Sequence, residues 1–264
     1  MSDEASRGAA PRYDEVADFY DGVVGDELDD PAAVALFDLL PDLAGLRVLD
    51  LACGQGRLSR ALARRGASVV GLDISSALLA RARTAEACEP LGIGYVEADA
   101  TSPGVLDGES FQLVTCHFGL SDIDDLRAAA ANVVQLLEPG GPFVFSILHP
   151  CFPGWGDDAP SSWPPGESYF TERWWRAESS GFRGKVGANH RMLSTYFNVL
   201  VEHGLAIESI AEPRPVGDWL RANPSEDLVP VFLVVRCRRI PEQGSPQGAL
   251  PNTGAAQRRV ARHR

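Results

Sequence analysis

Three acidic residues each follow a short apolar segment of the chain, and two glycines follow the first of them. Asp50 ends Val48-Leu49-Asp50, Asp73 ends a second apolar run, and Asp99 comes just after a third. Gly54 and Gly56 lie four and six residues after Asp50 and precede an amphipathic segment. Because glycine has no Cβ, such a turn between a strand and a helix lets the backbone approach a ligand closely. The pattern therefore favours a site for a nucleoside cofactor.

The glycine spacing leaves two kinds of cofactor to consider. Gly54-x-Gly56-x-x-Ser59 nearly satisfies the glycine-rich fingerprint of dinucleotide-binding proteins, so a nicotinamide- or flavin-dependent oxidoreductase is one alternative. Asp50 argues against it, since a carboxylate near a pyrophosphate would be repulsive. The same carboxylate would attract a nucleoside that carries a sulfonium and a free ammonium group.

The ordered motifs resemble a known family. The segment 50–56 resembles the glycine-rich first motif of the class I S-adenosylmethionine-dependent methyltransferases. Asp73 is placed like the acid of the second motif, which accepts hydrogen bonds from both ribose hydroxyls, and Asp99 like the acid that faces the adenine amino group. The segments 111–118 and 136–146 resemble the fourth strand and the turn and strand that follow it.

This resemblance implies S-adenosylmethionine as cofactor, with no metal ion. The implied cofactor-binding residues are Tyr20, Asp50, Ala52, Gly54, Gln55, Gly56, Asp73, Ile74, Asp99, Ala100 and His117. The chain departs from the family pattern at Ala52, where glycine is usual, and at Gln112, where aspartate is common. Each acid also has a purely structural interpretation, because a carboxylate at a strand end often caps the next helix.

Alternating apolar and amphipathic segments predict an α/β fold with a parallel sheet covered on both faces. The resemblance specifies a Rossmann-like, doubly wound sheet of seven strands, mostly parallel, with an antiparallel last strand and an insertion after strand five. Helices are expected first over 13–22 and 30–43. Further strands and helices are expected over 46–52, 57–66, 68–74, 76–88, 93–97, 111–118, 123–137, 142–148, 191–203, 205–212 and 229–237.

The insertion, residues 150–190, is rich in proline, glycine, serine and aromatic residues and contains four of the five tryptophans. Insertions after the strands of an open α/β sheet lie where ligands bind. We expect a lid that forms a flat, apolar acceptor pocket, with Trp155, Trp174 and His190 as substrate-contacting residues. The alternative is a surface excursion whose aromatic side chains merely pin it to the domain.

The termini and the composition limit the number of domains, the kinds of partner and the cellular compartment that we expect. We expect residues 1–12 and 239–264 to be disordered around a single methyltransferase domain over 13–238. A net charge of −12 argues against nucleic-acid and anionic-membrane partners. The five cysteines show no metal-binding or disulfide spacing, and no hydrophobic signal region is present, so we expect a reduced, cytoplasmic protein. Formation of a homodimer remains a possibility that the sequence does not decide.

Methyl transfer requires alignment of the acceptor more than an elaborate catalytic group. A hydroxyl acceptor also benefits from a general base, usually histidine. His149 is the candidate, because it directly follows the fifth predicted strand, and His117 and His190 are expected to border the cleft. The predicted function is methylation of an oxygen or nitrogen of a small aromatic or polycyclic metabolite. The alternative within the same cofactor class is a protein that uses S-adenosylmethionine without transferring its methyl group.

Overall fold

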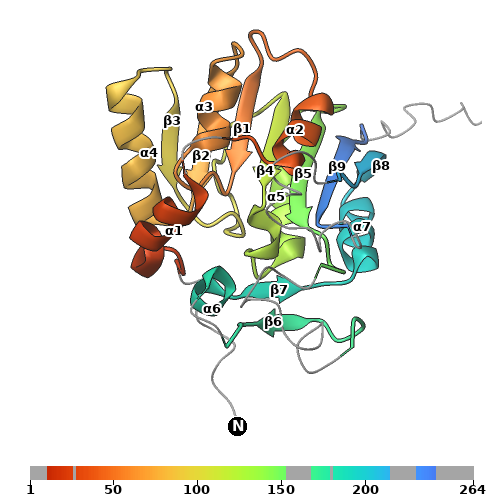
Figure 1. Cartoon of the computed structure of the whole chain (residues 1–264). Helices are drawn as coiled ribbons and strands as arrows, with labels where there is room; N and C mark the ends of the chain where they lie inside the picture. Colours follow the sequence, from red (N-terminus) through yellow and green to blue (C-terminus); the bar gives the residue numbers. More distant parts are fainter. Residues whose placement is uncertain (1–10, 26–27, 153–167, 179–180, 215–229, 242–264) are drawn as a thin grey trace, which may run out of the picture.

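The computed structural model describes residues 11–25, 28–152, 168–178, 181–214 and 230–241. Its main feature is a seven-stranded sheet in the order β3-β2-β1-β4-β5-β9-β8 (Figure 1). The strands are β1 (Arg47–Leu51), β2 (Ser68–Asp73), β3 (Gly94–Glu97), β4 (Leu113–His117), β5 (Pro142–Leu148), β8 (Leu205–Ala211) and β9 (Phe232–Arg239). Only β9 among these runs antiparallel to its neighbours β5 and β8. The predicted doubly wound sheet with an antiparallel last strand is confirmed.

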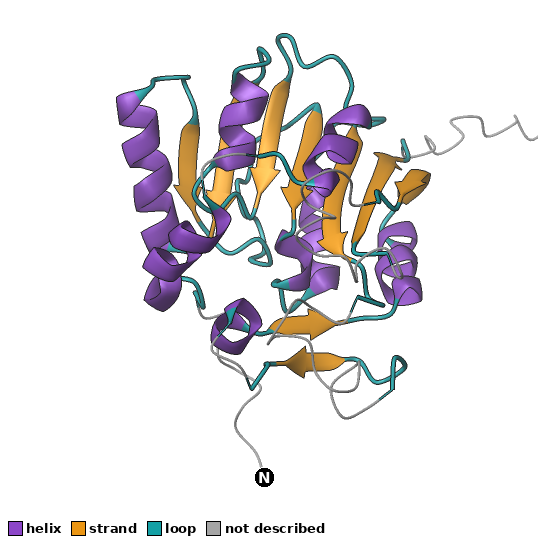
Figure 2. Cartoon of the chain, in the orientation of Figure 1, coloured by secondary structure: helices purple, strands orange, loops and turns teal. Residues whose placement is uncertain are grey.

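Helices pack on both faces of this sheet (Figure 2). The helices on these faces are α2 (Pro31–Asp38), α3 (Arg57–Ala63), α4 (Ser76–Cys88), α5 (Leu126–Leu136) and α7 (Leu193–Glu202). The N-terminal segment forms the short 3₁₀ helix η1 (Asp14–Val16) and α1 (Ala17–Val24), and a second 3₁₀ helix, η2 (Gly119–Ser121), follows β4. None of the described helices is long and apolar enough to cross a membrane.

Alternation along the strands divides the core into two clusters. Val48 packs with Leu36 of α2 and Leu58 of α3, whereas the adjacent Leu49 packs with residues of α5 and α7 such as Val133. Successive side chains of a strand point to opposite faces, so a strand covered on both sides is apolar throughout. This explains why the parallel strands read as continuous apolar runs.

The first helices differ most from their predicted bounds. The helix expected over 30–43 spans only Pro31–Asp38. Asp30 caps its start by accepting a hydrogen bond from the Ala33 N–H at 2.9 Å. The helix ends before Pro41, because a proline disfavours helical backbone in the residue that precedes it. Gln112, which replaces the common aspartate, accepts a hydrogen bond from the Arg47 N–H at 2.7 Å and so ties the starts of β1 and β4 together.

The described part of the insertion forms a small second sheet. Strands β6 (Arg173–Trp175) and β7 (Ala188–His190) pair antiparallel, with α6 (Phe182–Val186) between them. This unit lies beyond the carboxyl ends of the parallel strands, as Figure 1 shows below the main sheet. Residues 153–167 of the insertion, residues 1–10 and residues 242–264 lie outside the described residues. Arg12 and Arg239, at the edges of the predicted domain, are described, and β9 continues to Arg239.

Candidate active site

A cavity of about 450 Å³ lies at the carboxyl ends of β1, β2, β4 and β5. In an open α/β sheet this edge is the usual ligand site, at the point where the strand order reverses. Ten of the residues expected at the site line the cavity: Tyr20, Ala52, Gly54, Asp73, Ile74, Asp99, Ala100, His117, His149 and His190. Asp50, Gln55, Gly56 and Trp174 are not part of its lining, and Trp155 lies outside the described residues.

The turn after β1 requires unusual backbone angles. Ala52, Gly54 and Gly56 have φ values of 56°, 54° and 82°, in the left-handed region. Ala52 therefore adopts at some cost the conformation that glycine would adopt freely. A Cβ on Gly54 would meet no atom closer than 3.7 Å, whereas a Cβ on Gly56 would lie 2.4 Å from the Tyr95 hydroxyl oxygen. Gly54 thus faces the cavity, and Gly56 is required for packing.

Asp73 lies at the end of β2 with both carboxylate oxygens anchored. The Gly54 N–H donates to Oδ2 at 2.7 Å and the Ser75 N–H donates to Oδ1 at 2.8 Å. Burial raises the pKa of Asp73, although these backbone hydrogen bonds oppose the rise. The two bonds fix the carboxylate at the cavity wall, where each oxygen keeps a further lone pair for a ligand hydroxyl.

Asp99 lines the next part of the same wall. Its Oδ1 accepts hydrogen bonds from the Thr101 N–H at 2.8 Å and the Thr101 hydroxyl at 2.7 Å. Oδ2 accepts no hydrogen bond from any described residue. This carboxylate can therefore accept from an amino group such as that of adenine.

Asp50 lies behind the glycine turn instead of in the cavity. Its side chain accepts hydrogen bonds from the Ser59 hydroxyl at 2.6 Å and the Thr115 hydroxyl at 3.2 Å, and the residue is 1% exposed. Burial raises its pKa to about 6. The geometry therefore favours a structural role over the predicted contact with a ligand ammonium. Gln55 Nε2 donates to the Gly25 carbonyl at 2.9 Å, while its Oε1 is buried and accepts no hydrogen bond from any described residue.

His149 borders the cavity but both of its ring nitrogens are engaged. Nδ1 accepts a hydrogen bond from the Cys151 N–H at 3.1 Å. Nε2 lies 3.1 Å from Glu212 Oε1, within ion-pair distance but off the direction of a good hydrogen bond. Burial lowers the pKa of His149, and Glu212 opposes this. The ring is therefore neutral at pH 7, and its basic lone pair points to the backbone.

The other two histidines are also held in place. His117 Nδ1 lies 2.7 Å from Ser146 Oγ, and its Nε2 lies 3.3 Å from Asp30 Oδ2. His190 Nε2 donates to the Tyr169 carbonyl at 2.9 Å.

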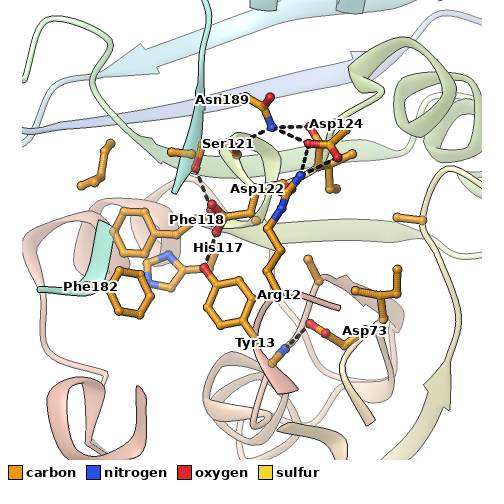
Figure 3. A pocket seen from close by; sticks show the side chains of 18 of the residues that line it. Arg12, Tyr13, Asp73, His117, Phe118, Ser121, Asp122, Asp124, Phe182 and Asn189 are labelled. Atoms are coloured by element: carbon orange, nitrogen blue, oxygen red, sulfur yellow. Dashed lines mark hydrogen bonds and ion pairs between the residues drawn. The ribbon is translucent and has the colours of Figure 1, made fainter. Parts of the chain in front are cut away.

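Sequence reasoning missed a polar network that covers the cavity (Figure 3). The Tyr13 hydroxyl donates to Asp122 Oδ2 at 2.5 Å, and Arg183 donates to Asp122 Oδ1 at 2.8 Å. A second ion pair beside it joins the Arg12 guanidinium to the Asp124 carboxylate at 2.5 Å. The network joins the N-terminal segment, the loop after β4 and the insertion, which are far apart in sequence and carry no shared motif.

Aromatic side chains form the rest of the cover. Tyr13, Tyr20 and Phe182 pack in a triangle with ring centroids 5.5–5.9 Å apart. Trp175 lines the cavity, whereas Trp174 packs on Gly187 and lies 5.6 Å from the Arg12 guanidinium.

The comparisons with known proteins agree with this geometry. A methyltransferase-domain family model matches residues 48–141. A crystal structure of an S-adenosylmethionine-dependent methyltransferase from Mesorhizobium loti is 35% identical and covers 80% of this chain and 99% of its own, with a TM-score of 0.66. This chain belongs to the S-adenosylmethionine-dependent methyltransferases. The expected family and cofactor are thereby confirmed.

Two further matches are one curated relative and one solved structure with the same fold. A ubiquinone biosynthesis O-methyltransferase of Pseudomonas fluorescens is 34% identical over 119 residues, 45% of this chain and 51% of the relative. The chain thus spans about half the length of the curated relatives that it matches. The magnesium protoporphyrin IX methyltransferase of Synechocystis, solved with bound S-adenosylhomocysteine, is 17% identical over 86% of this chain and 95% of its own, with a TM-score of 0.55, and shares the fold.

Proposed function

We propose that this methyltransferase acts on an oxygen or nitrogen of a small aromatic or polycyclic acceptor. The observation that carries the proposal is that one continuous cavity joins the acidic wall of Asp73 and Asp99 to a wall of aromatic side chains. These are Phe118, Phe152, Trp175, Phe182 and Phe232. A flat apolar acceptor suits such a wall, because aromatic rings stack favourably and apolar surface leaves water.

The cofactor half of the cavity has the groups that S-adenosylmethionine requires. In this proposal Asp73 accepts hydrogen bonds from the ribose hydroxyls, Asp99 accepts from the adenine amino group, and the open space at Gly54 admits the ligand against the backbone. When bound, the cofactor supplies a methyl group activated by the positive sulfur. The protein contributes orientation and the exclusion of water, through the cover formed by Tyr13, Tyr20 and Phe182.

A hydroxyl acceptor must also lose a proton. His149 is the proposed base, since it lines the cavity and is neutral at pH 7. Its Nδ1 lone pair is held by the Cys151 N–H, so the base role requires this hydrogen bond to open when the acceptor binds. The name of the Pseudomonas relative favours oxygen as the methylated atom.

The test is incubation of the purified protein with S-adenosylmethionine and a panel of phenols, polycyclic alcohols and aromatic amines, read by mass spectrometry. We expect one acceptor to gain a single methyl group as S-adenosylhomocysteine forms in equal amount. Cofactor binding without any methylated product across the panel would favour use of the cofactor without methyl transfer.

A further inference from the structure

Arg191 is a buried arginine on the insertion side of the cavity. It directly follows β7 and precedes α7, which packs against β8 at the end of the main sheet opposite to β3 (Figure 1). The residue lines the cavity and is 8% exposed. Because Asp73 and Asp99 follow β2 and β3, Arg191 belongs to the other part of the cavity, which the proposed function assigns to the acceptor.

The guanidinium of Arg191 is held by neutral groups only. Nη1 donates to the Leu120 carbonyl at 3.0 Å, and Nη2 donates to the Ile123 and Asp124 carbonyls at 2.6 and 2.8 Å. No carboxylate of a described residue lies within ion-pair distance of these nitrogens. A buried charge is costly unless an opposite charge accompanies it. The three hydrogen bonds therefore fix the guanidinium but leave its charge without a counter-ion.

The two acids of the adjoining loop are already paired with other arginines. Asp122 accepts a hydrogen bond from Arg183 at 2.8 Å, and Asp124 pairs with Arg12 at 2.5 Å. All four side chains line the cavity, as Arg191 does. Three guanidinium groups thus accompany two carboxylates on this wall, and the excess positive charge matches one anionic group of a ligand.

Aromatic rings lie beside this charge. The Tyr196 ring centroid is 5.8 Å from the Arg191 guanidinium, and Tyr196 and Trp175 both line the cavity. Burial raises the pKa of Tyr196 although the charge of Arg191 opposes the rise, so the phenol supplies no negative charge. An aromatic ring with an anionic substituent would fit both features, because its flat face can stack while its charge meets the guanidinium.

We propose that Arg191 binds a carboxylate group of the acceptor, so that the substrate is an aromatic acid. The inference rests on the proposed function, in which the aromatic wall holds the acceptor. Arginine binds a carboxylate through charge-assisted hydrogen bonds, which are stronger than those between neutral groups. A neutral analogue would leave the buried charge without a partner, so the subsite selects against it.

The test compares 2-naphthoate with 2-naphthamide, two flat ligands of nearly the same shape that differ in charge. Their affinities are measured by calorimetry on protein saturated with S-adenosylhomocysteine. The parent should bind 2-naphthoate about 10- to 100-fold more tightly, the range for a hydrogen bond to a charged group. Arg191→Gln should remove this preference, and Arg191→Lys should retain part of it. Both variants should bind S-adenosylhomocysteine within about threefold of the parent.

Arg127→Gln is the matched control, because it removes the same charge from the surface of α5, where Arg127 is mostly exposed and paired with Glu202. It should keep the full preference for 2-naphthoate.

Two results would overturn the carboxylate subsite and leave the proposed function standing. One is a parent protein that binds the amide as tightly as the carboxylate. The other is an unchanged preference in Arg191→Lys or in Arg191→Gln that is folded by circular dichroism. A tenfold loss of S-adenosylhomocysteine affinity in Arg191→Gln at an unchanged preference would assign the anion to the cofactor instead. Binding of neither naphthalene ligand would refute the subsite together with the aromatic acceptor wall.

Discussion

Replacing Asp50 by asparagine should stabilise the protein at neutral pH and reduce the pH dependence of its stability. Asp50 is 1% exposed, and its two partners are the hydroxyls of Ser59 and Thr115. These hydrogen bonds favour the ionised carboxylate. Burial outweighs them, because it disfavours the charged form, and the pKa rises from 3.8 to about 6.

The size of the effect follows from this shift. The interval between 3.8 and about 6, at about 1.36 kcal/mol for each pH unit, corresponds to about 3 kcal/mol. Since the folded pKa is raised, the protonated group contributes stability below pH 3.8, and this contribution is lost as the pH rises through about 6. Asparagine does not titrate. It forms a weaker hydrogen bond than the carboxylate, which offsets about 1 kcal/mol, so we expect a net gain of about 2 kcal/mol at pH 7.

The assay is urea unfolding of the parent and of Asp50→Asn at several pH values from 4.5 to 8, with S-adenosylhomocysteine affinity measured in parallel at pH 7. The difference in unfolding free energy should grow as the pH rises through 6 and then level off. A difference that stays constant with pH would refute the burial argument. The affinity should stay within about threefold, and a loss of tenfold or more would instead restore the predicted contact between Asp50 and the cofactor ammonium.

Three further outcomes are expected. Asp73→Ala should weaken S-adenosylhomocysteine at least tenfold by calorimetry, because a charged acceptor of hydrogen bonds is lost, and unchanged affinity would contradict its ribose role. Tyr13→Phe should raise the S-adenosylhomocysteine dissociation rate in stopped-flow fluorescence by about tenfold, since the bond to Asp122 closes the cover; an unchanged rate would mean that this bond does not limit release. His149→Ala should lower kcat for a hydroxyl acceptor by at least about 100-fold and abolish the acid limb of the pH–rate profile, which lies below the ordinary histidine pKa because burial lowers the pKa of His149. Parent activity in that variant would assign the imidazole to packing against the Cys151 backbone.

The sheet, and the position of Gly54, Asp73 and Asp99 at one cavity, could be predicted because local patterns determine them. The turn between β1 and α3 needs residues that tolerate positive φ, and the spacing of Gly54 and Gly56 predicts this turn from the sequence. Asp73 and Asp99 follow apolar strands of a parallel sheet, whose carboxyl ends meet at one edge. The apolar pattern of the strands and the position of each acid at a strand end were sufficient to predict that these residues lie near one another.

The same local patterns did not determine on which side of the turn the Asp50 side chain lies, and its predicted contact with the cofactor stays a prediction. Its position, four residues before Gly54, says that it lies near the turn but not on which side. The side is decided by its partners Ser59 and Thr115, which come from α3 and β4. These two residues are far from each other in sequence and meet Asp50 only when β1, α3 and β4 pack together.

The cover could not be predicted for a related reason. Tyr13, Asp122 and Arg183 are separated by more than 60 residues each, and no spacing rule joins them. One carboxylate accepts from a phenol on the N-terminal segment and from a guanidinium on the insertion. Because Asp122 bridges the two, the N-terminal segment and the described part of the insertion form one structural unit over the cavity. A substitution in either segment should therefore affect both ends of the cavity. The sequence motifs, taken one by one, would predict that the two ends respond independently.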